Sequence, residues 1–154
     1  VASAHDECVY VDGDYQTFGV GKFKEGGALT QARLDAALGH AYPSDRIPGR
    51  VSISLQQETN MINIQFGQPI NQRFLIPVSC SKGWLKFGQR QASQYVGDGA
   101  TLDYLNRNIE LGKTIDGDLV VHLTLDGQFS SFGVLKSRDV RESWSRFKEI
   151  KSED

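Results

Sequence analysis

An aromatic side chain and two cations fall at alternate positions of one short segment. If Gly83–Arg90 is a strand, Trp84, Lys86 and Arg90 share one face of it, and the other face is apolar. A tryptophan beside two cations can bind an anionic or carbohydrate ligand through stacking and charge. The alternative is that Trp84 packs at the start of the strand while both cations are solvated, as is usual for an isolated tryptophan. These three side chains are the candidate binding residues.

The two cysteines, Cys8 and Cys80, are far apart in the sequence. An even pair is what one structural disulfide requires, and in the chain-entropy model this bond would contribute about 4 kcal/mol. The alternative is two buried free thiols. Two thiols alone lack the spacing of a metal site. We therefore expect a Cys8–Cys80 disulfide.

The histidines and carboxylates give weaker sequence evidence for a site than the segment around Trp84 does. The chain has three histidines: His5, His40 and His122. No two of them have the spacing of metal ligands, and His122 is expected on the solvent-facing side of a strand. Asp103 and Glu110 lie in a strand-like stretch and could face a cleft, but a solvated surface is the usual place for such carboxylates. We predict no metal site and no cofactor.

Nucleophile and phosphate-binding motifs are absent from the sequence. There is no Gly-x-Ser-x-Gly elbow and no complete phosphate-binding glycine loop. Ser79-Cys80-Ser81-Lys82 matches Ser-x-x-Lys in its letters, but its companion motifs are missing. We therefore predict no catalytic residues.

Most of the chain alternates between apolar and polar residues, which predicts antiparallel strands with one dry and one wet face. The clearest examples are Val51–Leu55, Ile62–Phe66 and Leu119–Leu125. Asp-Gly pairs favour type I′ hairpin turns. They occur at Asp12-Gly13, Asp98-Gly99, Asp116-Gly117 and Asp126-Gly127. Glu58–Asn60 is expected to form a longer hairpin loop, and Gln89–Gly99 a mobile loop.

Two segments have helical spacing. In Thr30–Leu38, three apolar residues share one helical face, Thr30 can cap the start, and Gly39 can end the helix. In Ser137–Ile150, Val140, Trp144 and Phe147 stand at i, i+4 and i+7. We expect this C-terminal helix to bury its aromatic stripe against the sheet.

These elements predict a mostly β fold. It would be an antiparallel barrel or a strongly curved sheet, with one short inserted helix and a C-terminal helix, and a sandwich remains possible. The predicted inward side chains are mostly large, so we expect a filled core without an internal ligand pocket. This inward set is Ile53, Leu55, Ile62, Ile64, Phe66, Leu85, Phe87, Leu119, Val121, Leu123 and Leu125.

Length and charge exclude several classes of protein. The 154 residues fit a single domain, 1–154, and the net charge of −2 gives no electrostatic footprint for nucleic acid. No apolar run approaches the roughly 18 residues of a membrane-spanning helix, so no transmembrane segment is expected. The opening Val1-Ala2-Ser3-Ala4 would suit a position just after a cleaved signal peptide.

Four short patterns resemble a broad group of uncharacterised bacterial cell-envelope lipoproteins. They are Cys8-x4-Gly13-x-Tyr15, Cys80-x2-Gly83-Trp84, Asp116–Val121 and Trp144–Phe147. The resemblance implies export and a small β-rich domain, and it assigns no activity. Because His5-Asp6-Glu7 is too polar for a lipobox, a lipidated cysteine would lie upstream of Val1. The expected location is the periplasm or cell envelope.

Together these features predict a non-enzymatic envelope protein that binds another protein or an envelope component. One alternative is a carrier that holds a small apolar ligand inside a barrel. A second is a hydrolase whose site is not recognisable from sequence. If the core is filled, binding belongs on the outer face that carries Trp84, Lys86 and Arg90, or on Gln89–Gly99.

Overall fold

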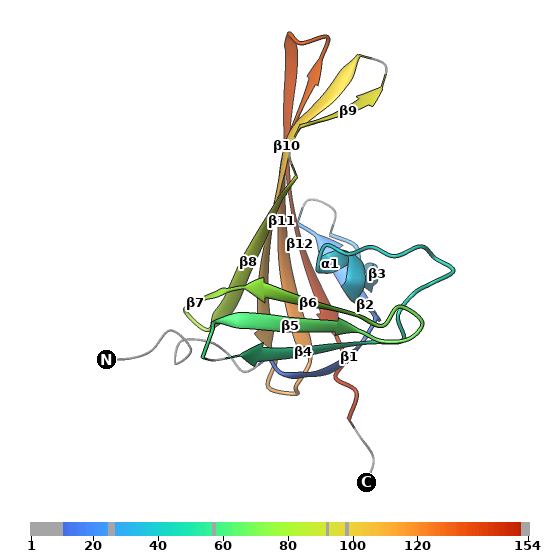
Figure 1. Cartoon of the computed structure of the whole chain (residues 1–154), viewed down its shortest axis with the longest axis vertical. Helices are drawn as coiled ribbons and strands as arrows, with labels where there is room; N and C mark the ends of the chain where they lie inside the picture. The colour runs from blue at the N-terminus through green and yellow to red at the C-terminus, as the bar shows by residue number, and fades with distance from the viewer. Residues whose placement is uncertain (1–10, 25–26, 57, 92, 98, 152–154) are drawn as a thin grey trace.

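A computed structural model describes residues 11–24, 27–56, 58–91, 93–97, 99–151 of the chain. As predicted, the fold is mostly β, and every strand pair in the described residues is antiparallel. The strands form two sheets that lie face to face at one end of the molecule (Figure 1). In the described residues neither sheet closes on itself, so the expected barrel is wrong and the architecture is an open, sandwich-like one.

The small sheet has four strands in the order β1-β4-β5-β6. Their bounds are β1 Gly13–Gln16, β4 Arg50–Gln56, β5 Met61–Phe66 and β6 Gln72–Pro77. The alternation in β4 and β5 has the predicted effect, because Ile53 and Ile64 pair with each other and both are buried. The turn at Glu58–Asn60 connects these two strands, which confirms the predicted hairpin.

The large sheet has the order β3-β2-β12-β11-β10-β8-β7, with β9 paired to β10. Its shorter strands are β2 Phe18–Phe23, β3 Thr30–Arg33, β7 Ser79–Ser81, β8 Trp84–Gln91 and β9 Gln94–Gly97. Three long strands form its centre: β10 Ala100–Lys113, β11 Leu119–Ser131 and β12 Leu135–Phe147. The Asp116-Gly117 pair lies in the predicted turn between β10 and β11, where the Gly117 N–H donates to the Thr114 carbonyl at 3.0 Å.

The core lies between the two sheets. Most of the predicted inward set is buried there, and Leu55 and Leu123 are partly buried against it. Leu125 is also only partly buried and does not belong to this core, so its predicted inward position is wrong. The small sheet supplies Val51, Ile53, Ile62, Ile64 and Phe66, and the large sheet supplies Leu85, Phe87, Ile109, Leu111, Leu119, Val121 and Phe147. Full burial of such side chains contributes about 1.5–3 kcal/mol each, which makes this the main stabilising region.

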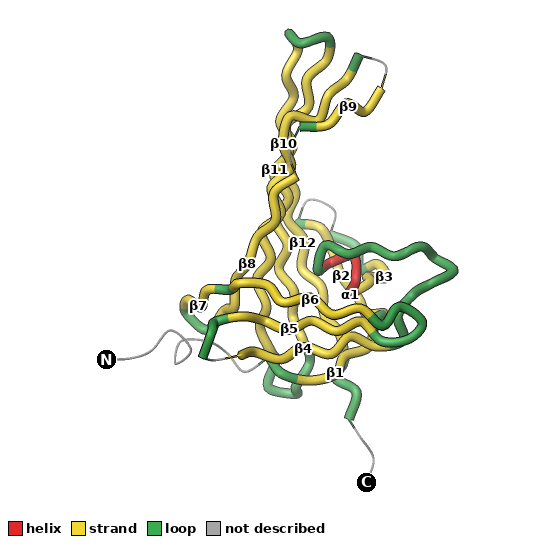
Figure 2. Tube along the Cα trace, viewed as in Figure 1, coloured by secondary structure: helices red, strands yellow, loops and turns green. Residues whose placement is uncertain are grey.

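The large sheet is much longer than the small one and extends past it as an arm (Figures 1 and 2). We define the arm as residues 94–97, 99–106 and 126–141, which comprise β9, the start of β10, the end of β11 and the start of β12 with their turns. Beside residues 100–102 of β10, β9 takes the place that β8 holds from Leu105 onward. The end of the arm consists of two neighbouring hairpins, β9–β10 and β11–β12 (Figure 1).

The hairpin between β11 and β12 turns later than predicted. Asp126 and Gly127 lie inside β11, paired with Asn106 and Leu105 of β10. The turn is formed instead by Phe132 and Gly133, which have φ of 54° and 73°. Two consecutive positive φ angles are the type I′ geometry that suits a twisted hairpin. The prediction missed it because phenylalanine seldom occupies the first of these positions.

The predicted C-terminal helix Ser137–Ile150 is wrong, because this segment forms most of strand β12. Because side chains alternate between the two faces of a strand, Val140, Trp144 and Phe147 do not share a face as they would in a helix. Phe147 points into the core and is buried, whereas Val140 and Trp144 lie on the opposite face. The hairpin at Phe132-Gly133 returns the chain along β11, where ladder hydrogen bonds over the whole length of β12 outweigh the helical pattern.

The inserted helix is shorter than predicted. Thr30–Arg33 is strand β3, paired with β2, and α1 spans only Leu34–Ala37. Thr30 is therefore not a helix cap, and Arg33 at the cap position makes no side-chain capping bond. Leu34 and Leu38 are buried in the core, and Gly39, with φ of 91°, follows the helix as expected. No helix in the described residues is long and apolar enough to cross a membrane.

Two further loop predictions are corrected. Gln89–Gly99 is not a mobile loop, since its described residues include the end of β8 and all of β9. Its Gly99 does lie at the turn between β9 and β10, with φ of 75°. Gly13 is a strand residue paired with Ile53 rather than a turn residue. The segment Cys8–Val11, expected to precede that turn, lies largely outside the described residues.

The first and last described strands meet at one corner of the core. Tyr15 forms a bridge with Glu149, and the Ile150 N–H donates to the Asp14 carbonyl at 2.7 Å. The buried Tyr15 hydroxyl donates to the Val11 carbonyl at 2.6 Å. Lys113 pairs with Glu149 at 2.9 Å beside it. This corner joins the small sheet to the end of β12 by backbone hydrogen bonds.

Candidate functional site

The predicted strand Gly83–Arg90 corresponds to β8, and its alternation is confirmed. Leu85 and Phe87 are buried in the core, so Trp84, Lys86 and Arg90 lie on the opposite, outer face of the large sheet. The antiparallel register places Lys86 beside Glu110, Glu110 beside His122, and His122 beside Trp144. Polar and aromatic side chains of four adjacent strands therefore meet on this face.

His122 lies at the centre of this group. Its Nδ1 is 3.1 Å from Glu110 Oε1, and its Nε2 is 2.6 Å from Glu142 Oε1. Each ring nitrogen thus lies within hydrogen-bond distance of a carboxylate oxygen. This side chain was predicted to face solvent, but only 14% of it is exposed. The ring is held in one orientation from both sides.

Two lysines extend this arrangement outward. Lys86 pairs with Glu110 at 3.7 Å, and Lys24 pairs with Glu142 at 3.3 Å. We call Lys86, Glu110, His122, Glu142 and Lys24 the charged network. Hydrogen bonding from His122, together with Lys24, holds the pKa of the Glu142 carboxyl below its usual value. Partly exposed pairs of this kind contribute only about 0.2–1 kcal/mol each, so the network orients side chains more than it stabilises the fold.

Two tryptophans pack beside the centre of the charged network. The Trp144 ring stacks on His122, with centroids 3.9 Å apart and planes 11° apart, and 37% of Trp144 is exposed. Trp84 meets Trp144 edge to face at 5.9 Å. Trp84 also lies over Gly112, where a Cβ atom would come within 2.8 Å of its ring. The glycine in β10 thus gives Trp84 its place on the sheet surface.

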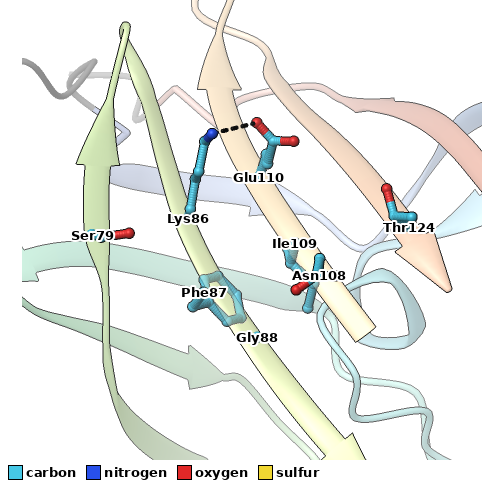
Figure 3. A pocket seen from close by; sticks show the side chains of 8 residues that line it. All are labelled: Ser79, Lys86, Phe87, Gly88, Asn108, Ile109, Glu110 and Thr124. Atoms are coloured by element: carbon cyan, nitrogen blue, oxygen red, sulfur yellow. Dashed lines mark ion pairs between the residues drawn. The ribbon is translucent and has the colours of Figure 1, made fainter. Parts of the chain in front are cut away.

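A hollow of about 480 Å³ opens beside the network (Figure 3). Gly88 is one of its lining residues, and its polar lining comes from Ser79, Lys86, Asn108, Glu110 and Thr124. Figure 3 shows Lys86 and Glu110 meeting across the strands at one end of this surface. A side chain at Gly88 would meet the Asn108 side chain, since a Cβ atom there would lie 3.2 Å from Asn108 Oδ1. The lining contains both hydrogen-bond donors and acceptors.

Arg90 lies farther along β8 and belongs to a second hollow of about 350 Å³. That hollow also contains Gly88 and Asn108, and it adds Asn106 and Asp126. The Arg90 guanidinium is 5.7 Å from the centre of the Tyr104 ring. The structure thus places Trp84 and Lys86 close to each other and Arg90 in the adjoining hollow, so the three candidates share a face but not one contact cluster.

The other candidate residues lie elsewhere. His40 stacks on Phe74 at 4.1 Å, and burial, with a smaller contribution from Arg107, lowers its pKa. Asp103 accepts hydrogen bonds from Ser130 and Gln128 in the arm. Among the described residues, no group of three or more potential ligand side chains could hold a metal ion.

The predicted disulfide and one histidine cannot be located. Cys8 and His5 lie outside the described residues. Cys80 is half-buried on β7, paired with Leu85 of β8. The Cys8–Cys80 bond therefore stays a prediction.

Sequence reasoning missed Glu142, Trp144 and Asn108 as members of the site. The first two were assigned to a helix, which would have carried them away from β8 and β10. A strand assignment for the segment after Phe132-Gly133 would have placed Trp144 opposite His122. Asn108 had no sequence signal, because its role depends on its position beside Gly88.

Comparisons with protein-family models, curated proteins and solved structures find no match for this chain.

Proposed function

We propose that this protein is a non-enzymatic envelope protein that binds a carbohydrate-bearing envelope component on the outer face of its large sheet. The observation that carries the proposal is an aromatic pair, Trp84 and Trp144, on the same face of the sheet as a polar hollow lined by Lys86, Gly88 and Glu110. Sugar hydroxyls both donate and accept hydrogen bonds. They can therefore donate to the carboxylate, accept from the ammonium group and do both with the amide around the hollow. The C–H face of a sugar ring is apolar enough to lie on an indole.

The arrangement is pre-organised, which favours binding. His122 is fixed between Glu110 and Glu142, and the stacked Trp144 ring is fixed by His122. Groups already held in position lose less conformational entropy when a ligand arrives. The two lysines at the ends of the network add a preference for saccharides that carry carboxylate or phosphate groups.

The same geometry argues against the two alternative functions, a hydrolase and a carrier of a small apolar ligand. Each nitrogen of His122 is bonded to a carboxylate, so the ring has no lone pair directed at a substrate, as a general base requires. The inward side chains of both sheets belong to one buried apolar cluster, which supports a filled core rather than a carrier. We place the protein in the periplasm or cell envelope.

Isothermal titration calorimetry with soluble disaccharide-peptide fragments of peptidoglycan and with neutral glucan oligosaccharides tests the proposal. We expect saturable binding of at least one of these probes. Trp144→Ala should weaken it at least about tenfold, the loss of roughly 1.4 kcal/mol of contact. Gly88→Val should also weaken it, because a side chain there fills the hollow and meets Asn108 and the Arg107 carbonyl at 3.2–3.3 Å.

The matched control is Gln65→Ala, an exposed polar residue on β5 in the other sheet. It should bind like the wild type. Absence of heat with every saccharide, or equal affinity in wild type and Gly88→Val, would reject carbohydrate recognition at this face. Capture of a protein partner that Trp144→Ala abolishes would instead assign the face to protein binding.

A further inference from the structure

The end of the arm has a different character from the outer face of the sheet. Phe132 and Val134, at the β11–β12 turn, are 76% and 77% exposed. Leu135 follows them, and Tyr95, Val96 and Phe129 are also exposed close to the ends of the same hairpins. We call these six residues the apolar tip. They are separated from the core by the length of the arm (Figure 1).

The two turns at this end are bound to each other. The Phe132 N–H donates to the Gly99 carbonyl of the neighbouring turn at 2.8 Å, and the Val134 N–H donates to the Ser131 carbonyl at 3.2 Å. The ring of Phe132 lies against Gly99, so a side chain at Gly99 would displace it. The Val134 bond is the ordinary hydrogen bond of a β-turn, whereas the Phe132 bond ties one turn to the other. These two amides therefore have partners within the protein, which lowers the cost of moving the turns out of water.

Charged side chains of the arm are also satisfied internally. Asp126 pairs with Arg138 at 2.8 Å, and Asp139 pairs with Arg141 at 2.9 Å. Asp103 accepts from Ser130 and Gln128 and lies in the field of Lys136. Lys136, directly after Leu135, is the described cation nearest to the tip in sequence. If the tip entered a lipid bilayer, a lysine beside it could extend its ammonium group to the lipid phosphates.

The size of the tip argues against a second copy of the chain as its partner. A standard protein interface draws on a broad patch of roughly 800 Å² from each partner, with complementary shape. The turns that carry the apolar tip form instead the narrow end of a projecting arm (Figure 1). A bilayer requires no complementary shape, and its affinity grows with the apolar area that enters it.

We propose that the apolar tip inserts into the interfacial region of a phospholipid bilayer. The arm then holds the core and the outer-face site away from the membrane surface. This function is independent of the saccharide site, because none of its residues belongs to the charged network or to the hollow beside it.

Vesicle flotation tests the insertion directly, using phosphatidylcholine vesicles with and without phosphatidylglycerol. The wild-type protein should float with the vesicles, and more of it with the anionic lipid because of Lys136. Phe132→Asp should reduce the bound fraction at least about tenfold, since burial of an aromatic side chain exceeds the free energy of a tenfold change. Ile115→Asp is the matched control. Ile115 is 106% exposed in the turn between β10 and β11, at the opposite end of the same strands.

Fluorescence adds a readout that does not depend on the affinity. Phe132→Trp should gain a blue shift and become quenchable by brominated lipid, whereas Ile115→Trp should not. Failure of the wild type to float with either vesicle, equal flotation of Phe132→Asp and wild type, or an unshifted Phe132→Trp spectrum would each overturn the proposal. A dimer by light scattering that Phe132→Asp converts to a monomer would overturn it in favour of self-association.

Discussion

The base and the arm are built from the same three long strands, yet they differ in what covers them. At the base, one face of β10, β11 and β12 packs on the small sheet, and residues such as Ile109, Val121 and Phe147 are buried. In the arm the sheet has lost that cover, and Phe129 and Leu135 are exposed. A sheet therefore need not be stabilised evenly along its length. Core packing holds the base, and the arm depends on ladder hydrogen bonds and side-chain pairs.

The sharpest way to separate the two regions is to truncate one apolar side chain in each, on the same strand. Phe147→Ala, at the base end of β12, should lower the free energy of unfolding by about 3–5 kcal/mol, because it empties a fully buried site. Leu135→Ala, at the arm end, should change it by no more than about 0.5 kcal/mol. Urea denaturation of both variants measures the difference. Equal midpoints would mean that the arm is packed as firmly as the base.

Trp144→Ala should change the free energy of unfolding by an amount between those of Phe147→Ala and Leu135→Ala. In the predicted helix Trp144 would be fully buried, and its truncation would lower the free energy of unfolding by about 3–5 kcal/mol. Its actual position, partly exposed and stacked on His122, predicts about 1–2 kcal/mol. The same urea titration checks this. A loss as large as that of Phe147→Ala would contradict the placement of Trp144 on the outer face.

Acid should have a smaller effect, and in the arm Asp103 reports it. Hydrogen bonds from Ser130 and Gln128 hold the pKa of Asp103 below its ordinary value of 3.8. Because this pKa is lower in the folded state, the carboxylate contributes stability above 3.8, and that contribution is lost as the pH falls through the folded value. A carboxyl-carbon NMR titration should show a depressed pKa for Asp103. In Ser130→Ala the value should move back upward, and an unchanged titration there would exclude this hydrogen bond as the main cause.

The base was the more predictable region, for a physical reason. Where a second layer covers the sheet, burial forces the period-two alternation that identified β4, β5, β8 and the first half of β11. It also identified the face of β8 that carries Trp84 and Lys86. The arm has no covering layer, so its sequence is free of that constraint. The helix predicted for β12 rested on three coincidentally spaced residues, of which Val140 lies in the arm and Trp144 and Phe147 lie at the base on opposite faces of the strand. Its turn at Phe132-Gly133 lacked the usual Asn or Asp before the glycine.

The site was only half predictable for a related reason. Trp84, Lys86 and Arg90 are near neighbours in the sequence, so strand parity alone placed them on one face. Their partners Glu110, His122 and Glu142 come from three other strands, and only the register brings them together. Register is a tertiary property that one sequence without pairing information does not contain.

The corner where Tyr15 meets Glu149 has a consequence for the order in which the molecule can be completed. The backbone partners of Asp14 and Gln16 are Ile150 and Lys148, which lie far along the sequence from β1. This edge of β1 therefore stays unpaired until the segment after β12 docks. Contacts between such distant parts of a chain form slowly, and open strand edges invite wrong pairing meanwhile. A folding chain is thus most vulnerable to aggregation through this edge before that segment is in place.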